Sequence, residues 1–259
     1  MNSLFLSDFF LKEIRSYVVL NSLLLTNSAF SYVRKYYYYY DFNRTDSLFY
    51  YHNIHVWKNR IHSQNQVSLD LRNCDIIDVD RIKDVFALNL SQNLLLKDVS
   101  CLGNVHTLHL SECPLVMDVS GLGNVRELYL QKNMFLTDVE SLGGNNRKVN
   151  LSRCFSIFTV FSLRNVHDVN LSYCYYLDDV SALGNVRFLN VQYCSSLVDV
   201  SALRNVYSLN ISHCGQIIDV SALQNTTILL MRCCTQVRDI SMLRNVPIIH
   251  SEGCNIHFF

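Results

Sequence analysis

A pattern of about twenty residues repeats along most of this chain and limits what the chain can fold into. Between residues 166 and 223 the pattern Asn-Val-x-x-Leu-Asn-Leu-Ser-x-Cys-x-x-Leu-x-Asp-Val-Ser-Ala-Leu occurs three times in succession. Its cysteine position is filled by Cys or Asn in ten units, spaced by twenty residues apart from one spacing of nineteen and one of twenty-one. The ten residues are Cys74, Asn93, Cys113, Asn133, Cys154, Cys174, Cys194, Cys214, Cys234 and Cys254. A repeat of this length predicts a solenoid, because each unit can bury its apolar face only by stacking on its neighbours.

The motif within each unit, Leu-x-Leu-x-x-Cys/Asn-x-x-Leu, resembles that of the leucine-rich repeat family from about Val67 to the C-terminus. The cysteine form is similar to the repeats that accompany F-box domains, and the Asp-Val-Ser-x-Leu segment resembles internalin-type repeats. Tyrosine- and asparagine-rich repeat proteins of large DNA viruses and amoebae are also similar. The resemblance implies an α/β solenoid, a right-handed leucine-rich repeat with about ten short parallel strands, preceded by a small helical N-terminal unit.

Three segments are predicted along the chain: a helical unit over residues 1–35, a tyrosine-rich connector over 36–62 and the solenoid over 63–259. The stretch from Leu6 to Val18 has helical periodicity and resembles the opening of an F-box, although Ser7 and Phe9 stand where that motif has proline and glutamate. The resemblance implies that this unit holds a cullin-linker protein. The residues expected to contact it are Leu6, Phe10, Ile14, Tyr17 and Leu24. An amphipathic helical cap for the solenoid is the alternative.

The connector interleaves aromatic and basic side chains, among them five consecutive tyrosines, Tyr36 to Tyr40. Such a segment can stack nucleic-acid bases. Packing of its rings between the helical unit and the first repeat is favoured, because the segment joins two domains. The 22 basic and 22 acidic side chains of the chain cancel, so neither nucleic acid nor an anionic membrane is expected as a partner.

Eight of the ten cysteines share the repeated position, which predicts buried thiols on one interior line about 5 Å apart and not disulfides. Free thiols favour a reducing compartment, the cytoplasm or nucleus. The N-terminus makes a poor secretory signal, since Asp8, Lys12, Glu13 and Arg15 interrupt its apolar run. No nucleophile and base pair, metal cluster or phosphate loop emerges, so neither an enzyme nor a cofactor is predicted.

The polar residues that recur from unit to unit are interpreted as structural. The recurring aspartate, as in Asp98, is expected to bond its own downstream amides, and Ser-x-Leu is expected to form one 3₁₀ turn. The asparagine that precedes each strand, as in Asn104, is expected to sit in a turn that tolerates positive φ. The irregular units near residues 139–165 are expected to bend or loosen, because Asn146 replaces an inward valine.

Function is expected where the repeats differ, on the concave sheet surface. Tyrosine and arginine are enriched at binding hot spots, and they gather in neighbouring columns of the central units. The predicted partner-binding residues are Arg153, Tyr173, Tyr193, His213, Phe188, Arg187 and Arg126, with the tyrosines and His213 stacked between Arg153 and Phe188. The alternative is a solvated sheet face with stacked asparagines. The predicted function is the substrate receptor of an F-box type ubiquitin ligase, or a repeat scaffold without a ligase that binds a host or cellular protein.

Overall fold

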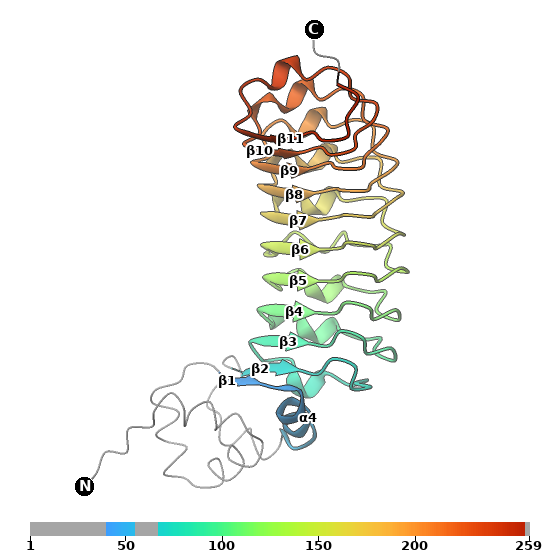
Figure 1. Cartoon of the computed structure of the whole chain (residues 1–259). Coiled ribbons are helices and arrows are strands. Elements are labelled where there is room, and N and C mark those ends of the chain that lie inside the picture. The colour runs from blue at the N-terminus through green and yellow to red at the C-terminus, as the bar shows by residue number, and fades with distance from the viewer. Residues whose placement is uncertain (1–39, 55–66, 257–259) are drawn as a thin grey trace, which may run out of the picture.

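The computed structural model describes residues 40–54 and 67–256. The predicted helical unit with its cullin-linker contacts, and residues 36–39 and 55–62 of the predicted connector, lie outside these residues. The ten predicted strands of the repeats are present, and an eleventh strand precedes them in the same parallel sheet (Figure 1). The strands are β1 (Tyr40–Phe42), β2 (Val67–Asp70), β3 (Ala87–Asn89), β4 (Thr107–His109), β5 (Glu127–Tyr129), β6 (Lys148–Asn150), β7 (Asp168–Asn170), β8 (Phe188–Asn190), β9 (Ser208–Asn210), β10 (Ile228–Leu230) and β11 (Ile248–His250).

The strands follow one another in sequence order, and each repeat strand pairs with its neighbours in register. Leu69 pairs with Leu88 and Leu88 with Leu108, so the central residue of each strand forms one continuous inward column. The residues on either side of it point to the outer face of the sheet, because side chains alternate along a strand. Each unit thereby buries its apolar residues only against the units before and after it, which confirms the predicted solenoid.

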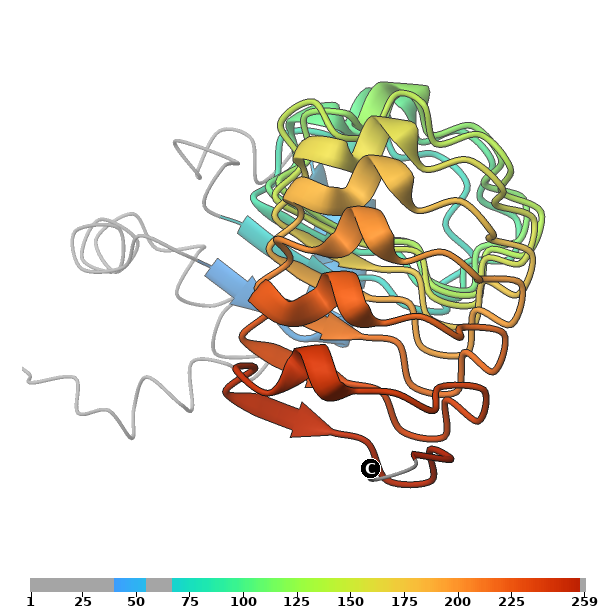
Figure 2. The same cartoon turned by 90° about the horizontal axis from the view of Figure 1, so that it is seen from above.

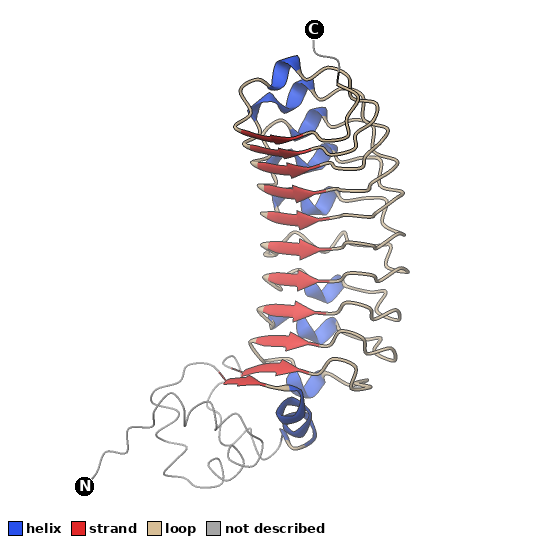
Figure 3. Cartoon of the chain, viewed as in Figure 1, coloured by secondary structure: helices blue, strands red, loops and turns tan. Residues whose placement is uncertain are grey.

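Short 3₁₀ helices run along the side of the solenoid opposite the strands (Figures 2 and 3). They are η2 (Asp80–Ile82), η3 (Ser100–Asn104), η4 (Ser120–Leu122), η5 (Phe161–Asn165), η6 (Ser181–Asn185), η7 (Ser201–Leu203), η8 (Ser221–Asn225) and η9 (Ser241–Leu243). The carboxylate of the recurring aspartate accepts a hydrogen bond from the backbone N–H of the residue two positions later, as Asp98 Oδ1 does from the Ser100 N–H at 2.9 Å. Both the aspartate turn and the single 3₁₀ turn are therefore confirmed.

The left-handed turn lies elsewhere than predicted. The asparagines before the strands do not have positive φ; the residue immediately before the Cys/Asn position does. Its members are Asn73, Gln92, Glu112, Lys132, Arg153, Tyr173, Tyr193, His213 and Cys233, with φ between 50° and 64°. Backbone bonds to the next unit fix this bend, as when the Tyr193 N–H donates to the Ser212 carbonyl at 3.0 Å. The chain thus turns at the end of the strand, not before it.

The predicted interior line of thiols is present. All ten cysteines are free, and the six from Cys113 to Cys234 in the repeated position are buried. Each buried thiol donates to a carbonyl of the preceding unit, for example Cys174 Sγ to the Leu151 oxygen at 3.4 Å and Cys214 Sγ to the Val191 oxygen at 3.1 Å. Each of these carbonyls also accepts an N–H from its own unit, so the thiol is its second donor. The cysteine column therefore binds adjacent units together as well as filling the core.

Asparagine in the same column makes a stronger version of this link. The Asn133 amide donates from Nδ2 to the Leu110 carbonyl at 2.9 Å, and its Oδ1 accepts the Cys113 N–H at 2.8 Å. Asn93 makes corresponding bonds to the first unit. A buried amide with partners for both its donor and its acceptor carries little desolvation penalty.

Asn146 is likewise buried and fully bonded, which removes the basis for a loosened unit at residues 139–165. Its Oδ1 accepts the Gly143 N–H at 2.8 Å, and its Nδ2 donates to the carbonyls of Leu122 and Val125. The strands on either side, β5 and β6, remain in register. The inserted residue is absorbed at Gly143, whose φ of 94° suits glycine.

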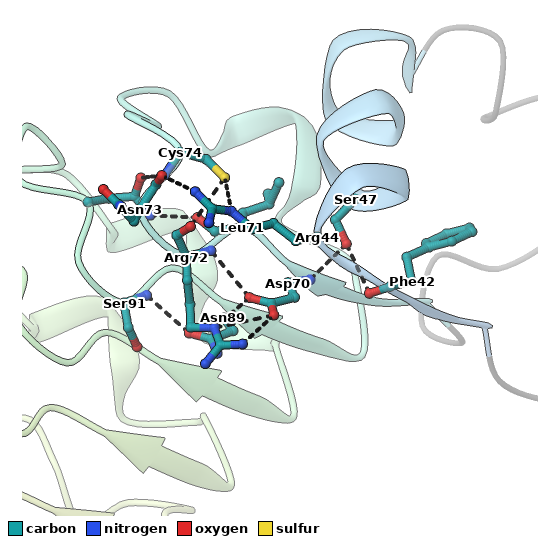
Figure 4. A network of polar contacts seen from close by, with 11 residues as sticks. Phe42, Arg44, Ser47, Asp70, Leu71, Arg72, Asn73, Cys74, Asn89 and Ser91 are labelled. Carbon is teal, nitrogen blue, oxygen red and sulfur yellow. Dashed lines mark hydrogen bonds and ion pairs between the residues drawn. The ribbon is translucent and has the colours of Figure 1, made fainter. Parts of the chain in front are cut away.

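The N-terminal end of the solenoid is covered by β1 and by α4 (Arg44–His52), as Figure 4 shows from close by. Asn43 caps this helix by accepting the Asp46 N–H at 3.0 Å. Ser47 then joins the helix to both strands, because its Oγ donates to the Phe42 carbonyl and accepts the Asp70 N–H at 2.8 Å.

The aromatic side chains of this segment pack onto the first unit. Tyr50 is completely buried, and the Tyr51 hydroxyl donates to the Asp78 carbonyl at 2.7 Å. Arg44 reaches the Asn73 carbonyl at 2.6 Å. For Tyr50 and Tyr51, the tyrosines of this segment whose side chains the structure describes, packing on the first unit is the observed role.

Candidate functional site

The outer face of the sheet carries two rims of aromatic and basic side chains, one at each end of the strands. Four predicted site residues lie on the rim that follows the strands. We call Arg153, Tyr173, Tyr193 and His213 the stacked row. The guanidinium of Arg153 lies 4.6 Å from the Tyr173 ring centroid, Tyr173 and Tyr193 stack at 4.5 Å, and Tyr193 and His213 stack at 4.2 Å.

The stacked row occupies the left-handed position of four consecutive units, with φ of 61° to 63°. This conformation costs a non-glycine residue roughly 1–2 kcal/mol. The bend is prepared by the preceding asparagine, since Asn170 Oδ1 accepts the Ser172 N–H at 3.0 Å and the Tyr173 N–H then donates to the Gln192 carbonyl at 2.8 Å. The rings therefore repeat at the spacing of the strands and stack without any adjustment of the backbone.

The rings of the stacked row are half-buried, while Arg153 is exposed. Because the rings face one another, it is their edges, with the phenol hydroxyls and imidazole nitrogens, that meet solvent. Partial burial and the neighbouring Tyr173 raise the pKa of the Tyr193 hydroxyl, so this group stays a neutral donor and acceptor at physiological pH.

The remaining predicted residues lie on the opposite rim, where the strands begin. Phe188 does not flank the stacked row as predicted. It is the first residue of β8, whereas Tyr193 follows the end of that strand, so the length of the strand separates the two side chains. Its ring instead contacts His167 at 5.4 Å and Tyr207 at 5.7 Å, and the Arg187 guanidinium lies 5.0 Å from the Tyr207 ring. Arg126 occupies the same column as Arg187, three units earlier, so the structure does not bring these two arginines together.

Between the rims the outer face holds a shallow hollow of about 370 Å³. Asparagines of β6 to β9 and the residues at the starts of these strands form most of its lining, which is Tyr129, Lys148, Val149, Asn150, Asp168, Val169, Asn170, Phe188, Leu189, Asn190, Ser208, Asn210 and Leu230. The row of asparagines contributes to the fold as well, because Asn150, Asn190 and Asn210 each accept the amide two residues later.

The predicted partner-binding residues did not include several aromatic and basic residues of this face and its rim. His109 and Tyr129, the last residues of β4 and β5, point to the outer face and stack at 4.2 Å between ring centroids. The Lys148 ammonium lies 5.4 Å from the centroid of the Tyr129 ring. Phe155 and Tyr175 stack at 5.2 Å just beyond the stacked row. The twenty-residue offset between the members of each pair was the available signal, since in-register residues always become neighbours.

Within residues 40–54 and 67–256, no group of three or more His, Cys, Asp or Glu side chains is arranged to hold a metal ion. None of the helices in these ranges is long and apolar enough to cross a membrane.

No protein-family model matches the chain, and no curated protein matches it. Three solved structures of internalins from Listeria monocytogenes are similar to it. Internalin InlF shares 17% identity over 69% of this chain and 70% of its own, with a TM-score of 0.47, and internalin C2 shares 19% over 72% and 81%, with a TM-score of 0.46. The functional domain of InlJ, described as including a cysteine ladder, shares 16% over 73% and 64%, with a TM-score of 0.30.

The class of the fold follows from the register and turns described above. One short parallel strand and one inward Cys or Asn in each unit of about twenty residues, with a 3₁₀ helix after most of the strands, define a leucine-rich repeat solenoid.

Proposed function

We propose that this chain is a protein-binding repeat scaffold whose partner docks on the outer face of the sheet, with the stacked row as its central contact. The observation that carries the proposal is the uninterrupted stack from Arg153 to His213. Tyrosine and arginine supply large contact areas and directional donors, and they dominate measured binding hot spots. The stack also fixes the rings before binding, so little side-chain entropy is lost when a partner arrives.

The partner expected on this face is polar and adaptable at its contact surface. The row offers hydroxyl and imidazole edges one layer apart, and the neighbouring hollow offers asparagine amides and the Lys148 ammonium. A folded protein loop that inserts side chains into the hollow and bonds the row of edges satisfies both features.

The test compares proteins that co-purify with the full chain and with the double variant Tyr173→Ala, Tyr193→Ala, quantified by mass spectrometry. A matched control is Arg204→Ala, which removes an exposed cation on the side opposite the strands. Proteins that are lost with the double variant and retained with the control support the proposal. Equal recovery with all three chains, each shown to be folded by circular dichroism, removes the stacked row as the site.

The finer form of the proposal is the substrate receptor of a cullin-linked ubiquitin ligase. It is supported by the resemblance of the stretch from Leu6 to Tyr17 to an F-box, with the implied linker contacts at Leu6, Phe10, Ile14, Tyr17 and Leu24. The alternative is a scaffold that binds a host or cellular protein without a ligase.

Two double variants separate these forms. Phe10→Ala with Ile14→Ala is expected to abolish co-purification of a cullin-linker protein while leaving the partner of the stacked row bound. Tyr173→Ala with Tyr193→Ala is expected to do the reverse. If no cullin-linker protein accompanies the unmodified chain in cells, the scaffold without a ligase is the function.

A further inference from the structure

A second surface of this molecule has an unusual concentration of exposed apolar side chains. It lies on the edge formed by the segments that follow the strands, at the right of Figure 1. Eight large apolar or aromatic side chains there are each at least 40% exposed. We call these residues the edge patch: Leu94, Leu95, Met117, Met134, Phe135, Phe158, Tyr175 and Tyr176. They come from the second to the sixth units, whose column residues run from Asn93 to Cys174.

The chain itself provides a comparison for the edge patch. In the next three units, the two positions after the column cysteine hold Ser195 and Ser196, then Gly215 and Gln216, then Thr235 and Gln236. These units keep the same strands, buried cysteines and 3₁₀ turns. Large apolar side chains at these two positions are therefore not required by the fold. At the position of Met117 and Phe158, two of these units also carry exposed apolar residues, Val198 and Ile218. Exposed apolar area of this extent, bordered by polar groups, marks an interaction surface.

The aromatic members of the edge patch are already partly ordered. The ring centroids of Phe158 and Tyr176 lie 6.0 Å apart, and Tyr175 stacks on Phe155 at 5.2 Å.

Four steps between strands separate the first and last units of the patch, which gives it a length of about 20 Å. An α-helix of roughly thirteen residues spans this length.

The charge bordering the patch indicates what chemistry it accepts. The segments 94–100, 114–120, 134–140, 155–161 and 175–181 contain six carboxylates and a single cation, Lys97, in a chain whose total charges cancel. The carboxylates are Asp98, Asp118, Asp138, Glu140, Asp178 and Asp179. Asp118 and Asp138 each accept one backbone N–H, from Ser120 and Glu140, at 2.8 Å, which fixes these carboxyl groups at the rim of the patch.

We infer that the edge patch is a docking surface for a basic amphipathic segment of a partner protein, with its apolar side chains on the patch and its lysines or arginines against the aspartates. The carboxylates repel nucleic-acid phosphates and anionic lipid headgroups, which excludes those two classes. This surface is distinct from the stacked row, which it adjoins only where Tyr175 meets Tyr173 edge-on at 6.3 Å.

The experiment measures the anisotropy of two labelled synthetic peptides with the full chain. One is an amphipathic helical peptide of leucine and lysine, and the other has the same leucines with glutamate in place of each lysine. The patch variant is Phe135→Gln, Phe158→Thr, Tyr176→Ser, which installs residue types that other units carry at the same positions, so the fold is expected to persist. The charge variant is Asp118→Asn, Asp138→Asn, in which asparagine keeps the acceptor for each backbone N–H.

The lysine peptide is expected to bind the unmodified chain at least about tenfold more tightly than the patch variant, and several-fold more tightly than the charge variant. Gln216→Ala and Gln236→Ala, which lie outside the patch, are expected to leave the binding of the lysine peptide unchanged. Equal binding by the unmodified chain and the patch variant overturns the inference, and so does equal binding of the glutamate peptide. The inference is also overturned if the unmodified chain self-associates and the patch variant does not, because a second copy of the chain then occupies the patch.

Discussion

The phenol ring of Tyr193 lies parallel to the imidazole of His213, at 4.2 Å between centroids and 5° between planes, although both residues have left-handed backbones. The strain at each position is about 1–2 kcal/mol, and an aromatic pair returns about 0.5–1.5 kcal/mol. The two effects are of similar size, so the row keeps its bulky side chains at little net cost. This balance makes the contributions of backbone and ring separable by substitution.

Tyr193→Asn is expected to remove the stack while keeping a side chain that tolerates positive φ. Tyr193→Val removes the stack and adds a β-branched side chain, which is strongly disfavoured in the left-handed backbone conformation. We therefore expect the valine variant to be less stable than the asparagine variant by about 1–2 kcal/mol in urea unfolding. Equal stability of the two variants would show that the backbone relaxes away from this conformation.

Asn133→Ala is expected to destabilise the solenoid more than Asn133→Cys. Alanine leaves the Cys113 N–H and the Leu110 carbonyl without their present partner, at roughly 1–3 kcal/mol for each buried group. Cysteine restores a donor to the Leu110 carbonyl of the preceding unit, as Cys174 provides one to the Leu151 carbonyl. The measurement is urea unfolding of both variants, and the reverse order would contradict the role assigned to this column.

The buried thiols are expected to resist alkylation until the chain unfolds. Burial raises the pKa of Cys174 and of Cys214 to about 12, so almost no thiolate is present at neutral pH. Burial and the nearby Asp80 carboxylate also raise the pKa of Cys101, to about 11. Iodoacetamide labelling followed by mass spectrometry should therefore detect the partly exposed Cys74 and Cys233 first. Labelling of Cys174 at the same rate in the folded chain would contradict the interior line.

The aspartate turns are expected to lose their contribution to stability in acid. Hydrogen bonds from Ser201 hold the pKa of Asp199 below its ordinary value of 3.8. Because the folded pKa is the lower one, the stabilisation is complete above the ordinary value and disappears as the pH falls through the folded value. Asp199→Asn keeps the acceptor and should flatten this dependence slightly. Unfolding midpoints measured between about pH 3 and pH 7 test the effect, with Gln224→Ala as control.

Asn146→Val restores the residue type that most units carry at this position, yet it is expected to destabilise the chain by roughly 1–3 kcal/mol. The substitution leaves the Gly143 N–H and two carbonyls without the side chain that bonds them. Hydrogen exchange in β6 of the unmodified chain should be as slow as in β7. Faster exchange in β6 than in β7 would support the loosened unit that the sequence predicted at residues 139–165. Asn145→Ala, which breaks only an exposed side-chain bond, is the matched control.

The features that the sequence predicts are those that the repeat itself enforces. A constant period places Cys174, Cys194 and Cys214 on one line, and it stacks Tyr173 on Tyr193 whatever the details of the turn. The aspartate turn is also predictable, because Asp and Ser at this spacing form a local motif that needs no partner from another unit.

The position of the left-handed residue was not predictable, because Asn73 and Gly253 occupy it only in the two end units, while side chains as different as Gln92, Glu112 and Tyr173 occupy it between them. The bend is fixed by a hydrogen bond from the backbone N–H of this residue to a carbonyl of the next unit. Such a contact between units cannot be read from the residues of one unit alone. Phe188 was placed on the wrong rim for a related reason, since listing variable columns says nothing about which end of the strand each one occupies. The partners of Asn146 were hidden because they arise from the inserted Gly143.

Strict register also has a consequence for how such a molecule changes length. Each layer meets the next at about 4.8 Å with every side chain over its counterpart. Gain or loss of one whole unit therefore moves everything beyond it by a single step and by the small rotation between neighbouring units, and it leaves each residue on the same face of its own unit. The separation between the N-terminal helix and any surface along the rod is set by counting layers, so that distance can change in whole steps while the chemistry of the surface stays the same.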